Sequence, residues 1–200
     1  MKKIISLFQK NHATDHLARN EVTPGAEWVV AGEGKATRKL DGTCCMVRGG
    51  RLFKRREVHC GPPRDLDANG NTVFDYNFPP GFELESTDDV THKAFGWVPV
   101  TTAKEDRWCN EAFGGDLLPD GTYELCGPKI NGNPEASPKH ELFLHGAIEL
   151  PECPRDFDGI RKYLSGLDIE GVVWHNHDGR MVKVKCRDFG IKRIKISNVT

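Results

Sequence analysis

Long apolar runs are absent from this sequence. No window approaches 18 uncharged apolar residues, which is about the shortest stretch that spans a bilayer as a helix. The amino-terminal stretch MKKIISLFQKNHATDHL begins with basic residues, but the apolar run that follows has only about five residues, whereas a secretory signal needs roughly 7 to 15. We therefore expect a cytoplasmic protein with no membrane partner.

The cysteines lack the spacing of a disulfide framework or a zinc site. There are seven, none of them in a Cys-x-x-Cys pair, and Cys44 and Cys45 are adjacent. An odd number and adjacent residues are not typical of secreted disulfide-bonded domains. His59-Cys60, His175 and His177 do not have the spacing of zinc ligands either. We expect reduced thiols, most of them buried as small apolar side chains.

The sequence has almost no net charge, which gives no overall sign of a nucleic-acid partner. The formal net charge is −1, but the charges are segregated along the chain. Residues 180–195 hold seven Lys and Arg against one Asp, and residues 48–56 hold five with no acidic residue. Such stretches are either solvated strand faces or local basic surfaces that bind phosphates.

Internal repeats and low-complexity segments are absent, and helical patterns are few. Short apolar runs rich in Val, Ile, Phe and Cys are separated by Gly, Pro, Asn and Asp, which favours strands. Helical spacing predicts helices over 3–18, 102–114 and 155–166. We expect one α+β domain over residues 1–200, with largely antiparallel sheets and a loop-rich insertion at about 61–95.

Two β-hairpins are predicted. The stretch TCCMVR-GG-RLFKRR, residues 43–56, has a Gly-Gly turn between two strands. The stretch IEGVVWHNHDGRMVKVKC is the second, with a turn of two residues at Asp178-Gly179 or of four at 176–179. Because side chains alternate along a strand, either turn places three charged residues on one face: Glu170, Lys183 and Lys185. A turn of three residues would break this arrangement.

Lysines beside a carboxylate on a half-buried sheet are costly unless an anion or a metal lies over them. The alternative is an exposed sheet face with ordinary ion pairs. The second hairpin is therefore a candidate phosphate site, which needs a nucleophile to become a catalytic one.

Two lysines in GKATRKLDGTCC could serve a nucleotide site. Lys35 does not fit a phosphate-binding loop, because Ala36 stands where Ser or Thr must contact magnesium and Val29 where the first glycine is required. Lys39 begins Lys-Leu-Asp-Gly, which is either a simple turn signal or a lysine that attacks an α-phosphate. Such an amine must first lose its proton, which neighbouring ammonium groups and a divalent cation promote. The second hairpin offers those groups.

At this point the sequence resembles a known superfamily. KLDG resembles motif I of the covalent nucleotidyltransferases, which include polynucleotide ligases and mRNA capping enzymes; YELCG resembles motif III, EGVVWH motif IV and KVK motif V, in the right order. More narrowly, ATRKLDGTCC, GWVPV, INGNP, HGA and IEGVVWH are similar to the vertebrate-type ATP-dependent 5′-to-3′ RNA ligases. The resemblance covers roughly residues 28–190 and implies a nucleotidyltransferase fold of antiparallel sheets flanked by helices.

The resemblance implies the roles of four charged residues. Lys39 would carry AMP as the nucleophile. Lys183 and Lys185 would act with it as catalytic residues that hold the α-phosphate while pyrophosphate leaves. Glu170 would bind the divalent metal, Mg²⁺ or Mn²⁺.

The resemblance also implies a wider set of ATP contacts. Arg55 would lie near the ribose and the acceptor 5′-phosphate, with Arg56 pointing to the other face, and Glu124 would hydrogen-bond the ribose hydroxyls. Either Phe143 or His145 would stack on the adenine, and we favour His145. The expected ATP contacts are Thr37, Arg55, Glu124, Phe143, His145, Glu170, Lys183 and Lys185.

The implied function is ATP-dependent joining of an RNA 5′-phosphate to an RNA 3′-hydroxyl, through lysyl-AMP and adenylylated RNA. The 15 residues after Lys185 leave no room for the oligonucleotide-binding (OB) domain of DNA ligases and capping enzymes, so we expect none. A DNA ligase, a capping-type enzyme and a catalytically silent RNA-binding module of the same fold remain alternatives. The polar loop at 130–140 would either contact substrate or serve as a spacer.

Overall fold

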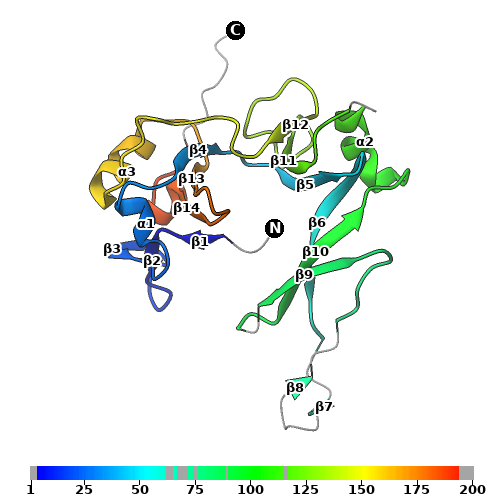
Figure 1. Cartoon of the computed structure of the whole chain (residues 1–200), viewed down its shortest axis with the longest axis horizontal. Coiled ribbons are helices and arrows are strands. Elements are labelled where there is room, and N and C mark those ends of the chain that lie inside the picture. Colours follow the sequence, from blue (N-terminus) through cyan, green and yellow to red (C-terminus); the bar gives the residue numbers. More distant parts are fainter. Residues whose placement is uncertain are drawn as a thin grey trace. The chain divides into compact units, whose positions relative to one another are not determined.

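The computed structural model describes residues 4–61, 65–66, 72–73, 76–88, 90–114 and 117–193. They form an α+β protein with mostly antiparallel sheets and few helices, as the sequence predicts (Figure 1). The described chain falls into two compact units: the first contains residues from 43 to 132 and 137–144, and the second contains 4–42, 133–136 and 145–193. The single domain over 1–200 stays a prediction.

The second unit is built on a four-stranded sheet. Its order is β1 (Ile5–Ser6), β14 (Met181–Lys185), β13 (Gly171–His175) and β4 (Lys35–Lys39). The pairs β13–β14 and β13–β4 are antiparallel, whereas β1 pairs parallel to β14. One face of the sheet packs into the core of this unit through five residues: Ala36, Val172, Trp174, Val182 and Val184. The opposite face is left for polar side chains.

Two α-helices and a 3₁₀ helix pack in the second unit beside its sheet. Helix α3 (Phe157–Ser165) begins at Asp156, whose side chain accepts a hydrogen bond from the Gly159 amide at 2.8 Å, and buries Ile160 and Leu164. The short helix α1 (Glu27–Val30) buries Trp28 and Val29, and the 3₁₀ helix η2 (Cys186–Phe189) follows β14 directly.

The predicted helix over 3–18 is wrong. The described part of this segment forms β1 and β2 (Phe8–Lys10), and β2 pairs with β3 (Ala18–Val22). Leu7 and Phe8 are both buried because the chain changes partner there, from β14 to β3. The spacing of Ile5 and Phe8 imitates a helix, but tertiary pairing overrides this local signal.

The first unit contains a six-stranded antiparallel sheet. Its order is β12 (Glu141–Leu144), β11 (Gly121–Cys126), β5 (Thr43–Arg48), β6 (Arg51–His59), β10 (Lys93–Pro99) and β9 (Glu83–Asp88). Cys45, Val47, Leu52, Tyr123 and Leu125 form its buried core with Cys109 of α2 (Arg107–Phe113). The 3₁₀ helix η1 (Lys104–Asp106) precedes α2, and β7 (Asp65–Leu66) pairs with β8 (Thr72–Val73).

Several local predictions are confirmed. The hairpin over 43–56 forms with Arg48 opposite Arg51, and Gly49 and Gly50 both have positive φ angles of 56° and 68°, as a two-residue hairpin turn requires. The helices expected at 102–114 and 155–166 correspond to η1 with α2 and to α3. Within the predicted loop-rich insertion at 61–95, residues 62–64, 67–71, 74–75 and 89 lie outside the described residues, and the prediction is wrong for β9 and the start of β10, which are strands of the six-stranded sheet.

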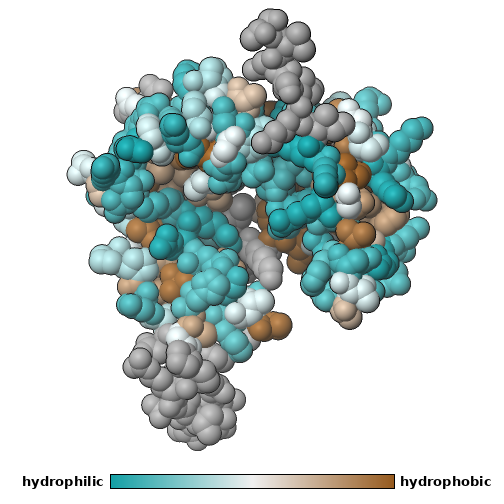
Figure 2. Space-filling model, turned by 180° about the vertical axis from the view of Figure 1, so that it is seen from behind, coloured by the Kyte–Doolittle hydropathy of each residue, from teal (hydrophilic) through white to brown (hydrophobic). Residues whose placement is uncertain are grey.

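No helix in the described part of the chain is long and apolar enough to cross a membrane. Figure 2 shows hydrophilic side chains over most of the face that it presents, with apolar residues in small separate patches. All seven cysteines are free thiols, and five of them are buried, as expected.

Candidate functional site

The turn of the second hairpin has three residues, the length that breaks the predicted alternation of Glu170, Lys183 and Lys185. His175 pairs with Met181 and the Asn176 amide donates to Arg180 O at 2.9 Å, which leaves a three-residue turn, 177–179. Gly179 has a φ of +86°, the usual feature of such turns. The predicted register is therefore wrong: Lys183 pairs with Val173 and Lys185 with Gly171.

Glu170 nevertheless lies beside Lys185, because it precedes β13 and does not follow the alternation of that strand. Its Oε1 atom is 2.5 Å from Lys185 Nζ, and its Oε2 atom is 2.5 Å from Lys39 Nζ. The side chain of Glu170 is 17% exposed. One carboxylate thus bridges two ammonium groups from different strands.

Strand pairing explains how the two lysines meet. Lys39 ends β4 opposite Gly171, and Gly171 lies opposite Lys185, so the lysines flank a residue with no side chain. A Cβ atom at Gly171 would lie 2.0 Å from Val184 O. The glycine therefore allows β13 and β14 to approach closely where Gly171 pairs with Lys185. The space that a side chain of residue 171 would fill is open to Glu170.

The electrostatics of this cluster favour the charged form of Glu170 and disfavour the charged form of Lys183. Burial would raise the pKa of Glu170, but the positive charge of Lys39 and the hydrogen bond from Lys185 outweigh it and hold that pKa below its usual value. For Lys183, burial and the charges of Lys185, Lys39 and Lys10 lower the pKa to about 8. An anion over Lys183 would relieve this repulsion.

Thr37 lies on the same polar face as Lys39, two positions before it on β4. It is 2% exposed, and its hydroxyl donates to Val173 O at 3.0 Å and contacts His175 Nε2 at 3.1 Å. Burial, with a smaller effect of His145, lowers the pKa of His175, so the ring favours the neutral form and Nε2 donates to the hydroxyl. From the sequence His175 was considered only as a zinc ligand, and its place on the same face of β13 as Gly171 and Val173 was missed.

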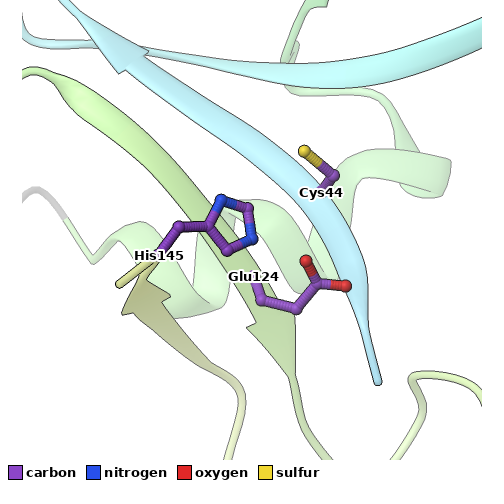
Figure 3. A group of neighbouring side chains, drawn as sticks. All are labelled: Cys44, Glu124 and His145. Atoms are coloured by element: carbon purple, nitrogen blue, oxygen red, sulfur yellow. The ribbon is translucent and has the colours of Figure 1, made fainter. Parts of the chain in front are cut away.

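Three other predicted ATP contacts belong to the first unit. Glu124 of β11 lies opposite Cys44 of β5 on one side and Phe143 of β12 on the other, on the sheet face away from the core with α2. Figure 3 shows the side chains of Cys44 and Glu124, together with His145, which follows β12 directly. Glu124 is 8% exposed.

Arg55 of β6 points to this face too. It pairs with Trp97, and its guanidinium carbon lies 4.7 Å from the centre of the Phe95 ring. Arg56 is exposed and lies opposite Gly96 on the other face of the strand pair. By contrast, Lys35 in the second unit is 73% exposed and pairs with Glu149 at 2.8 Å.

The structure thus brings together Thr37, Lys39, Glu170, Lys183 and Lys185 on one sheet of the second unit. Arg55, Glu124 and Phe143 share a sheet face of the first unit. Sequence reasoning missed three residues that adjoin the Lys39 segment, namely Arg38, Glu135 and Arg193. Glu135 lies in the polar loop 130–140, Arg193 in the basic stretch 180–195 and Arg38 beside Lys39, but nothing in the sequence indicated that the three meet.

This geometry can bind a phosphate group and present an amine to it. The sequence is also similar to known proteins. The family model for RNA ligase 1 matches residues 114–198. RNA ligase 1 of Danio rerio is 32% identical over 88% of this chain and 73% of that protein. RNA ligase 1 of Mus musculus is 28% identical, over 78% of this chain and 67% of that protein.

Proposed function

Because the chain belongs to the RNA ligase 1 family, we propose that it is an ATP-dependent RNA ligase whose nucleophile is Lys39. The observation that carries this proposal is the cluster in which Lys39 and Lys185 share the Glu170 carboxylate, each at 2.5 Å. Lys183 lies next to them and is destabilised as a cation. A nucleotide phosphate is a ligand that would use all three ammonium groups.

In the first step, Lys39 Nζ attacks the α-phosphorus of ATP. A P–N bond forms, the bond between the α-phosphorus and the β-bridging oxygen breaks, and pyrophosphate leaves. The amine must lose a proton to react, and the neighbouring ammonium groups of Lys183 and Lys185, with a divalent cation, would promote its loss to solvent by disfavouring a further positive charge. Lys183 and Lys185 would balance the negative charge of the phosphates in the transition state.

A divalent metal fits this donor set. Mg²⁺ uses oxygen ligands and needs only one or two carboxylates when substrate phosphates supply the rest, and Glu170 offers a carboxylate within the lysine cluster. Mn²⁺ takes similar ligands. Bound there, the ion would neutralise charge on the triphosphate, while Lys183 and Lys185 hold the phosphate by direct contact.

The remaining steps transfer AMP to RNA and release it. An oxygen of the RNA 5′-phosphate attacks the AMP phosphorus, and the P–N bond to Lys39 breaks. The 3′-hydroxyl of a second RNA end then attacks the 5′-phosphate, which forms the phosphodiester bond and releases AMP. In this scheme Arg55 and Glu124 contact the ribose, Arg55 also serves the acceptor phosphate, and Phe143 or His145 stacks on the base.

The first test is covalent labelling. Protein freed of bound AMP with pyrophosphate is incubated with Mg²⁺ and ATP labelled at the α-phosphate, denatured, and examined for retained label. We expect label in the wild type and none in Lys39→Ala, since no other group replaces the nucleophile. Lys35→Ala is the matched control and should keep the label, because its side chain is exposed and pairs with Glu149.

Folded wild-type protein that takes no label would contradict the proposal and favour a silent RNA-binding module. Label that persists in Lys39→Ala would assign the chemistry to another residue. A labelled protein is then given RNA with 5′-phosphate and 3′-hydroxyl ends, and the matching DNA strands in parallel, to decide which strands it joins.

A further inference from the structure

Glu135 is a buried carboxylate in the polar loop for which the sequence offered only a general role. Its side chain is 4% exposed, and it accepts three hydrogen bonds. Oε2 accepts from Arg38 Nη2 at 2.5 Å, and Oε1 accepts from the Asp41 amide and from Arg193 Nη1, both at 2.9 Å. The carboxylate therefore holds the residue before Lys39 and the residue two positions after it.

The same arginines reach the segment that carries Glu170. Arg193 Nε donates to Asp168 Oδ1 at 2.7 Å, and the guanidinium groups of Arg193 and Arg38 donate to Asp168 O at 3.2 and 3.3 Å. Asp168 lies two residues before Glu170. Glu135 thus completes a chain of ion pairs and hydrogen bonds that joins the segment of Lys39 to the segment of its carboxylate partner.

The backbone around Glu135 has a conformation that side chains normally avoid. Ala136 has a φ of +52° and Asn133 a φ of +56°, and the Ala136 amide donates to Asn133 O at 3.1 Å. Asn tolerates this region, but Ala does not favour it. Such a conformation persists where the surroundings enforce it, often near functional sites, and the three hydrogen bonds of Glu135 are among the contacts that hold this turn.

We propose that Glu135 is a positioning residue for Lys39, acting through Arg38, Arg193 and the Asp41 amide to fix the distance between the Lys39 amine and Glu170. This proposal rests on the proposed function of Lys39. The positive charges of Arg38 and Arg193 balance the negative charges of Glu135 and Asp168. Without the charge of Glu135, only Asp168 remains to hold the two guanidinium groups. The Lys39 segment is then no longer held at a fixed position relative to Glu170.

The test is the single-turnover rate of lysyl-AMP formation at saturating ATP. We expect Glu135→Gln to slow this rate by about tenfold to hundredfold, because a displacement of about 1 Å at a reacting group has effects of this size. The ATP concentration that gives half the maximal rate should change little, since the proposed role is to place the amine. The rate constant of the labelling time course does not depend on how much of the protein is folded.

Two further variants separate positioning from general stability. Glu149→Gln, which removes an exposed ion pair of the same unit, should keep the wild-type rate. Arg193→Met should slow the reaction as Glu135→Gln does, and the double variant should be no slower than either single one, because both changes break one network.

The outcomes distinguish this proposal from the proposed function. Without label on the wild type, the role of Lys39 itself fails. If the wild type is labelled and Glu135→Gln reacts at the same rate, only the positioning role is wrong. A Glu135→Gln protein that does not fold, or additive effects of the two changes, would also overturn it, because the residue would then be purely structural.

Discussion

At the scale of single residues, the site is defined by charges that the fold holds in an unfavourable state. Lys183 is the clearest case, because burial and the cations Lys185, Lys39 and Lys10 lower its pKa to about 8. Glu170 offsets part of this effect. Residues that lower the stability of the folded protein are typical of functional sites, because the arrangement that activity needs is often not the most stable one.

Replacement of Lys183 by Met should stabilise the protein at pH 7. Between pH 8 and 10.5 the unfolded chain binds a proton that folded Lys183 has lost, so the wild type gains stability as the pH rises through this window. The variant should therefore have a free energy of unfolding higher by on the order of 1 to 3 kcal/mol at pH 7, and the difference should shrink towards pH 10. Urea denaturation at both pH values measures it.

Lys35→Met is the control, because it makes the same substitution at an exposed lysine. Its free energy of unfolding should be almost the same as that of the wild type at both pH values. A Lys183→Met protein that is less stable than the wild type at pH 7 would show that the ammonium group is stabilising, against this interpretation.

At the scale of elements, the site depends on the β13–β14 hairpin and on a glycine at its base. Gly171 lies between Lys39 and Lys185 in adjacent strands, where a Cβ atom would be 2.0 Å from Val184 O and 2.8 Å from Lys185 Cα. Backbone atoms cannot move aside as the end of a side chain can. The close pairing of these strands therefore requires glycine for space.

Gly171→Ala should open this row of the sheet. We expect a loss of about 1 to 3 kcal/mol in the free energy of unfolding, as for other overpacked sites, and a loss of lysyl-AMP formation because Lys185 moves from Glu170. Gly179→Asn in the turn is the matched control: nothing lies within 4 Å of its added Cβ, and Asn tolerates the positive φ. Equal losses of stability in the two variants would refute the steric argument.

Elements with strong local signals were predictable from the sequence. The Gly-Gly hairpin of 43–56 and the helix α3 follow from turn residues and apolar spacing. Strands β1 and β2 do not, because both are short and β1 pairs with the distant β14. The turn of the second hairpin shows the same limit: Asp178 and Gly179 indicate a turn but not its number of residues. Glu135 was not predictable as a neighbour of Lys39, because its contacts depend on tertiary structure.

At the scale of the whole molecule, the basic stretches are less available to a ligand than their composition indicates. In 48–56, Arg48 pairs with Glu83 at 2.6 Å and Lys54 pairs with Asp106. In 180–195, Arg193 is held by Glu135 and Asp168, and residues 194 and 195 lie outside the described residues. Exposed arginines such as Arg51 and Arg56 are better candidates for contacts with RNA phosphates.

If the chain binds RNA as proposed, affinity should fall as salt rises, with a slope set by the phosphate contacts. Arg51→Ala with Arg56→Ala should reduce the slope of log affinity against log salt by about 1 to 1.5, at roughly 0.7 for each contact with a single strand. Fluorescence anisotropy at several salt concentrations measures this. Arg19→Ala, which removes an arginine paired with Asp15, should leave the slope unchanged; an unchanged slope in the double variant would place the RNA elsewhere.

The parallel pairing of β1 with β14 has a consequence for the order in which the protein acquires its structure. The Leu7 amide donates to Lys183 O, and Lys10 pairs with Asp188 across 178 positions of sequence. During synthesis, the amino-terminal strand must therefore wait until nearly the whole described chain has left the ribosome. Contacts of such high sequence separation form slowly, so the cluster of Lys39, Lys183 and Lys185 is completed late. A nascent chain therefore holds Lys39, the proposed nucleophile, without the cations that would make it reactive.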